Sequence, residues 1–67
     1  MNLIINGKSE QLEIEKLADL FGYLKIKEEE KGFAIAVNEE VIFRSAWQSA
    51  LLQKGDRVEI IRATQGG

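Results

Sequence analysis

The 67-residue sequence contains no cysteine and no histidine. Without cysteine it can form neither a disulfide framework nor a thiolate nucleophile, so a domain this small must be held together by packing. Without histidine it lacks the usual general base, and the two absences together remove nearly every type of zinc site. We therefore predict a protein that is not an enzyme, with no catalytic residue, no bound metal and no bound cofactor.

Long hydrophobic runs and an excess of positive charge are also absent. No apolar stretch approaches the roughly 18 residues needed to span a bilayer. Eleven acidic residues outnumber nine basic ones, for a net charge of −2. The two signs alternate along the chain, whereas nucleic-acid-binding proteins carry a basic patch or stripe. We expect no membrane partner, no nucleic-acid partner and a cytoplasmic location.

The length and composition predict one globular domain. Hydrophobic residues make up 45% of the chain and charged residues 30%, which is ordinary for a folded domain and argues against disorder. A chain of this size cannot form a deep substrate pocket and also keep a packed interior. We expect a monomer in which residues 1–62 form the domain and residues 63–67 form a flexible tail.

The dipeptide Asn6-Gly7 lies between two apolar stretches and predicts a tight hairpin, because both turn positions need positive φ. We expect strands near residues 2–6 and 8–14. Their apolar side chains are then expected to lie opposite one another, Leu3 and Ile5 against Leu12 and Ile14.

Apolar residues spaced by three and four predict an amphipathic helix near residues 15–25; they are Leu17, Leu20, Phe21 and Leu24. Asp19 suits the positive N-terminal end, but no capping residue stands at the start and Gly22 weakens the interior. The loop that follows contains Glu28, Glu29 and Glu30. Adjacent carboxylates on a loop do not converge on a cation without further ligands, so a solvated loop is favoured over a cation site.

Three further strands are predicted in the second half of the chain. Residues 33–37 form a continuous apolar run typical of a strand buried on both faces. Residues 41–43 form a shorter strand, and residues 57–62 form the last one. Ser45 is expected to cap a short helical turn, and Trp47 is interpreted as a core residue rather than a ligand platform.

The chain ends in Gly66-Gly67, directly after the last patterned strand and a short linking segment. A terminal pair without side chains adds no packing and loses the most backbone entropy when it is ordered, which indicates a role outside the fold. We interpret Gln65, Gly66 and Gly67 as a thin main-chain probe whose carboxylate enters a narrow site on another protein. A frayed end is the alternative. The carboxylate is ionised at neutral pH and is a poor electrophile, so another enzyme must activate it.

Four blocks of the sequence stand out together: Ala34-Ile35-Ala36-Val37-Asn38-Glu39, Arg44 with Trp47, Lys54-Gly55-Asp56-Arg57-Val58, and Gly66-Gly67. In residues and spacing the chain resembles the ThiS family, the sulfur carriers of thiamine biosynthesis, over nearly its full length. One departure is Phe43, where many family members carry proline. The resemblance implies a ubiquitin-like β-grasp fold, an α+β architecture in which a mixed sheet of four to five strands packs on one helix. Arg44 and Trp47 are interpreted as structural.

The resemblance also implies the chemistry. A ThiF-type activating enzyme would use ATP to adenylate Gly67. Sulfur from a cysteine desulfurase would displace AMP and leave a C-terminal thiocarboxylate, which a ThiG-type thiazole synthase would consume. Three alternatives share the fold: the small subunit of molybdopterin synthase, a ubiquitin-like modifier conjugated through Gly67, and a plain β-grasp interaction module.

A carrier must also bind its partners through the folded domain. Strand alternation places Ile4 and Ile61 on the sheet face opposite the helix, beside Arg57, Glu59 and Phe43. We predict that these five residues form a docking patch of mixed apolar and charged character. The alternative is that they are scattered surface residues without a role.

Overall fold

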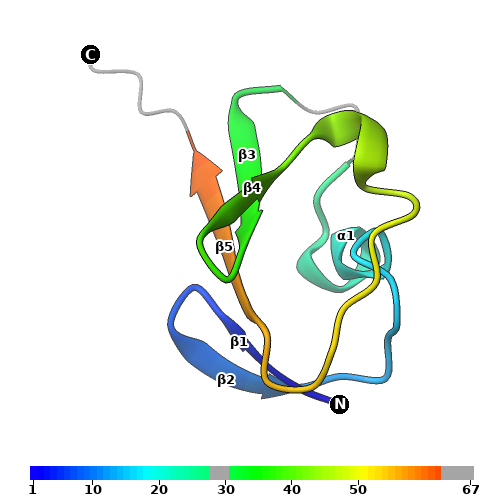
Figure 1. Cartoon of the computed structure of the whole chain (residues 1–67), viewed down its shortest axis with the longest axis vertical. Coiled ribbons are helices and arrows are strands. Elements are labelled where there is room, and N and C mark those ends of the chain that lie inside the picture. The colour runs from blue at the N-terminus through cyan, green and yellow to red at the C-terminus, as the bar shows by residue number, and fades with distance from the viewer. Residues whose placement is uncertain (28–30, 63–67) are drawn as a thin grey trace.

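The computed structural model describes residues 1–27 and 31–62, and its main element is a five-stranded mixed sheet (Figure 1). The strands are β1 (Asn2–Ile5), β2 (Lys8–Gln11), β3 (Phe33–Val37), β4 (Glu40–Ile42) and β5 (Arg57–Arg62). Their order is β2-β1-β5-β3-β4, in which β1 and β5 are parallel and every other pair is antiparallel. The helix α1 (Asp19–Leu24) packs on one face of the sheet, and a 3-10 turn, η1 (Arg44–Ala46), follows β4. The predicted α+β fold is confirmed.

The hairpin between β1 and β2 forms at the predicted Asn6-Gly7 turn, where both residues have positive φ (51° and 83°). The predicted extent of the second strand is wrong. Leu12 and Ile14 lie beyond β2, and the residues opposite Leu3 and Ile5 are charged. A two-residue turn fixes the register of the two strands. The apolar side chain of Leu12 still reaches the core, because the chain bends there toward α1.

The helix α1 begins later than predicted because the backbone before it forms hydrogen bonds elsewhere. The N–H of Leu17 donates to the carbonyl of Ala50 (2.9 Å), and the N–H of Leu52 donates to the carbonyl of Glu15 (2.8 Å). Tertiary contacts therefore override the local helical pattern over this stretch. The predicted apolar face is nevertheless correct, since these side chains all contribute to the core: Leu17, Leu20, Phe21 and Leu24.

β3 and β5 have the predicted bounds, whereas β4 spans residues 40–42 instead of 41–43. The difference comes from a two-residue turn at Asn38 and Glu39, both of which have positive φ (52° and 73°). The Asn38 side chain ties this turn to the start of β5. Its Oδ1 accepts the N–H of Arg57 (3.0 Å), and its Nδ2 donates to Oδ1 of Asp56 (3.0 Å).

The core lies between α1 and the sheet, and its fully buried side chains come from both layers and from the segment before the helix: Leu3, Leu17, Leu20, Ile35 and Val58. Trp47 is also buried, and its Nε1–H donates to the carbonyl of Ile42 (2.9 Å). The interpretation of Trp47 as a core residue is confirmed. The prediction that Ser45 caps the helical turn is wrong, because Ser45 lies inside η1 and Phe43 precedes it.

The carboxylate of Asp19 supplies a pH-dependent part of the stability. It accepts hydrogen bonds from the backbone N–H groups of Lys16 (3.1 Å) and Glu15 (3.3 Å). These bonds hold the pKa of Asp19 below its usual 3.8. A carboxyl group with a depressed folded-state pKa stabilises the protein above its unfolded-state pKa, and this stabilisation is lost as the pH falls through the folded-state pKa.

We expect Asp19→Asn to lower the urea midpoint of unfolding at neutral pH. Because the wild-type carboxylate becomes protonated in acid, the midpoints of the two proteins should converge as the pH falls below the usual value of 3.8. Urea titrations followed by circular dichroism at a series of pH values measure this. A midpoint difference that stays constant from neutral to acidic pH would contradict the role of this carboxylate.

Candidate docking site

β5 presents three side chains on the sheet face away from α1. Arg57, Glu59 and Ile61 are exposed, whereas Val58 is buried and Ile60 packs partly buried against the core. This is the two-residue alternation of a strand with one face on the core. β5 therefore carries a cation, an anion and an isoleucine in one row on its outer side.

The register of the sheet places Ile4 of β1 beside this row, because Ile4 pairs with Arg57. A groove of about 200 Å³ lies there, lined by Ile4, Gly7, Glu39, Arg57, Val58 and Glu59. Ile61 lies further along β5, outside the groove. Three of the five predicted docking residues therefore come together in one depression.

Phe43 reaches the same face from the far side of β3. It follows β4 with an extended backbone (φ −63°, ψ 146°), and it is 77% exposed. Val41, two residues earlier, shares this face and pairs with Ala36, whose other neighbour across the sheet is Glu59. Val41 was missing from the predicted patch, although its alternation with Phe43 in the expected strand was a signal that could have found it.

We call the six side chains on this face the outer patch: Ile4, Val41, Phe43, Arg57, Glu59 and Ile61. Its exposed apolar members are Val41 (55%), Phe43 (77%) and Ile61 (49%). Ala34 and Ala36 lie between them on β3, paired with Ile61 and Glu59 of β5. Because alanine side chains are short, a partner can approach the sheet closely along this central line.

Arg57 of the outer patch forms a weak, solvent-exposed ion pair with Glu39. Nη2 of Arg57 lies 4.0 Å from Oε2 of Glu39, and the two side chains are 61% and 83% exposed. Solvent screens an ion pair of this kind, so it contributes little to the stability of the domain. A partner that separates the pair therefore loses little free energy in doing so.

The predicted tail residues Gln65, Gly66 and Gly67 lie outside the described residues. The last described residue is Arg62, at the end of β5. Five residues follow it, and five fully extended residues span at most about 17 Å.

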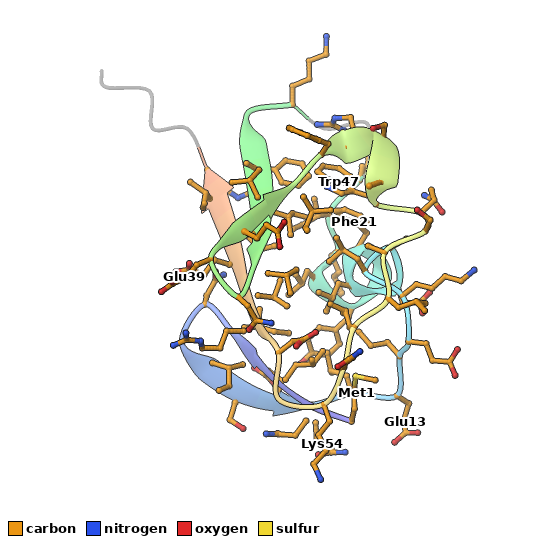
Figure 2. All side chains as sticks on the ribbon, in the orientation of Figure 1. Met1, Glu13, Phe21, Glu39, Trp47 and Lys54 are labelled. Carbon is orange, nitrogen blue, oxygen red and sulfur yellow. The ribbon has the colours of Figure 1, made fainter. Side chains whose placement is uncertain are left out.

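Arg44 belongs to an aromatic cluster and not to the outer patch. Its Cζ lies 4.5 Å from the ring centroid of Trp47 and 5.7 Å from that of Phe33. The Trp47 ring in turn contacts Phe21, at 5.0 Å between centroids, in the space between the sheet and α1 (Figure 2). Arg44 thus covers the edge of the core, which agrees with its structural interpretation.

Among residues 1–27 and 31–62, no group of three or more histidine, cysteine, aspartate or glutamate side chains gathers as metal ligands would. The cation site weighed at Glu28, Glu29 and Glu30 falls outside these residues. Within the described chain, no helix has the length and apolar character needed to cross a membrane.

The topology defines the class of protein. A mixed sheet with the first and last strands parallel at its centre, and a helix packed on one face, is a ubiquitin-like β-grasp domain. The ThiS family model matches residues 3–67, which is nearly the whole chain. The chain belongs to the ThiS family. It is therefore a sulfur carrier of thiamine biosynthesis, a protein on which enzymes act and not itself an enzyme.

Two solved structures support this assignment. The chain is similar to the crystal structure of a thiamine biosynthesis protein, ThiS, from Geobacter metallireducens, with a TM-score of 0.82, 28% identity and 100% of both chains covered. It is also similar to an NMR solution structure of a thiamine biosynthesis protein from the same organism, with a TM-score of 0.77, 30% identity, and 100% and 88% of the two chains covered. No curated protein sequence matches it significantly.

We expect Trp47→Phe to destabilise the domain by about 1–3 kcal/mol, because it removes the hydrogen bond from the indole N–H to the carbonyl of Ile42 and opens a small cavity. Tyr23→Phe is the matched control, since it also removes one hydrogen bond, from the Tyr23 hydroxyl to Oε1 of Glu10 (2.9 Å), but at an exposed site. Urea unfolding measures both. Equal midpoints for the two variants would contradict a structural role for Trp47.

Proposed function

We propose that Gly67 is the residue that carries the sulfur and that the outer patch is the surface by which partner enzymes bind the domain. The family match, which extends through Gly67, is the observation that carries this proposal. The tail consists of residues 63–67, joined to a domain of residues 1–62. Reactive chemistry is confined to the terminal carboxylate, and everything that activates it belongs to other proteins.

The proposed cycle begins with adenylation by a ThiF-type enzyme. The Gly67 carboxylate attacks the α-phosphate of ATP and releases pyrophosphate, and the resulting acyl adenylate has AMP as a good leaving group. Sulfur that a cysteine desulfurase supplies as a persulfide, with two electrons from a thiol reductant, displaces AMP and leaves the thiocarboxylate. A ThiG-type thiazole synthase takes the sulfur, and the carrier returns as the carboxylate. These partners act in the cytoplasm, where the carrier is a monomer between encounters.

The glycine pair suits a closed active site. Gly66 and Gly67 have no Cβ, so an enzyme can hold them as bare extended backbone in a narrow channel. A channel of that kind excludes water, which would otherwise hydrolyse the acyl adenylate. A side chain at either position would widen the segment and keep the carboxylate away from ATP.

The outer patch suits reversible docking. It combines three exposed apolar residues with Arg57 and Glu59, whose charges help to orient an approaching partner. It also includes Ile61, on the strand that leads into the tail. A partner bound there is therefore already close to the segment on which it acts.

Removing Gly67, or replacing Gly66→Val, should abolish ATP-dependent thiocarboxylate formation while leaving the fold intact. The cause is loss of the reacting carboxylate in the first variant and a steric block in the second. Intact-mass spectrometry after incubation with activating enzyme, ATP and sulfur donor detects exchange of one oxygen for sulfur, and circular dichroism monitors the fold. Normal sulfur loading of either variant would refute the tail as the carrier site.

Ile61→Asp should weaken binding to the activating enzyme by about tenfold or more, because it places an unpaired charge in the apolar part of the contact. Leu51→Asp is the matched control, since Leu51 is also exposed (69%) but lies on the segment that bridges to Lys16, away from the outer patch. Isothermal titration calorimetry measures both affinities. Unchanged affinity for Ile61→Asp, or an equal loss for Leu51→Asp, would rule out docking through this face.

A further inference from the structure

We infer that Phe33 is a positioning residue for sulfur loading: its ring holds Arg62, the last residue of β5, and so fixes the point from which the tail leaves the domain. Phe33 is the first residue of β3, and it pairs with Arg62 across the sheet. The inference rests on the proposed use of Gly67, because only a tail that must deliver its end to an active site needs a fixed origin.

The backbone pattern explains why a side-chain contact matters at this pair. In an antiparallel ladder, hydrogen-bonded pairs alternate with pairs that exchange no backbone hydrogen bond. The N–H of Asn38 donates to the carbonyl of Arg57 (2.7 Å) at one end of the ladder. Counting along the register from there makes Ala34 and Ile61 the last hydrogen-bonded pair. Phe33 and Arg62 therefore form a pair of the other type, whose side chains lie closest together.

The side chains of that last pair are in contact. Cζ of Arg62 lies 5.7 Å from the centroid of the Phe33 ring, within the range of a cation–π contact. Cζ of Arg44 lies at the same distance from the ring. The ring of Phe33 thus contacts guanidinium groups from two elements, the end of β5 and η1.

The Phe33 ring is itself fixed to the core. It stacks on Trp47, with 5.3 Å between centroids and 24° between planes, and meets the edge of Phe21 at 6.2 Å. Trp47 and Phe21 are both buried, and Figure 2 shows them side by side within the core. The end of β5 is therefore linked through one ring to the buried aromatic side chains of the core.

Separation of Phe33 from Arg62 would present an activating enzyme with a longer and less constrained tail. The tail would then begin after Ile61 and contain six residues instead of five, so its maximum reach would grow from about 17 Å to about 20 Å. A longer tether with a less defined origin presents its end in the reactive geometry less often. Docking through the outer patch would be unaffected, so loss of the contact should lower kcat more than it raises KM for the carrier.

Amide hydrogen exchange tests the contact directly. We expect Phe33→Leu and Arg62→Gln to speed exchange at Ile61 by about tenfold relative to exchange at Asn38, at the far end of the same ladder, because local opening affects only nearby amides. Phe33→Tyr keeps the ring and should behave as wild type. Tyr23→Leu, which removes an exposed aromatic ring from α1, is the matched control. Because Arg62→Gln leaves the core untouched, the test stands even if Phe33→Leu fails to fold.

Steady-state loading by the activating enzyme tests the consequence. We expect kcat for thiocarboxylate formation to fall about fivefold in Phe33→Leu and Arg62→Gln, with KM for the carrier within about twofold of wild type and with recovery in Phe33→Tyr. Equal acceleration of exchange at Ile61 and Asn38, or wild-type kcat in both variants, would overturn the positioning role while leaving the carrier function standing. Failure of the wild-type protein to load would overturn both.

Discussion

The central position of β5 is the constraint on which the rest of the molecule depends. β5 is held between β1, with which it is parallel, and β3, with which it is antiparallel. Strand alternation then sends Val58 and Ile60 toward the helix and leaves the outer row exposed. The same strand is the last element before the tail. Core packing, the proposed docking surface and the proposed delivery of the terminus therefore all follow from one pairing register.

A domain of this size without cysteine depends on how well its few large side chains pack. The aromatic residues Phe21, Phe33 and Trp47 meet in one cluster, and Arg44 and Arg62 lie over its rings. The cluster lies at the end of the domain where β5 stops (Figures 1 and 2). The aromatic part of the core is thus placed at the end of β5, the strand that precedes the proposed carrier tail.

The small size of the chain also explains why the carrier depends on other enzymes for its chemistry. A chain that cannot enclose a pocket cannot shield an acyl adenylate from water, but it can present a reactive end at a fixed place. Under the proposed function, the outer patch is the surface that a partner binds, and the five residues after Arg62 limit the distance to the carboxylate. In this arrangement the carrier domain determines which partner binds, and the partner enzyme performs the reaction.

Features that arise from local stereochemistry could be predicted from the amino-acid sequence. Neighbouring residues were enough to predict the Asn6-Gly7 turn, the bounds of β3 and β5, the apolar face of α1 and the family motifs. The start of α1 and the sheet order that places Val41, through Ala36, in line with Glu59 could not be predicted in this way. Each of these depends on segments distant in the chain: Ala50 takes the N–H of Leu17, and β3 brings Val41 and β5 together. These features become visible in the folded protein alone, because a backbone group or a side chain can meet such a partner only after the chain has folded.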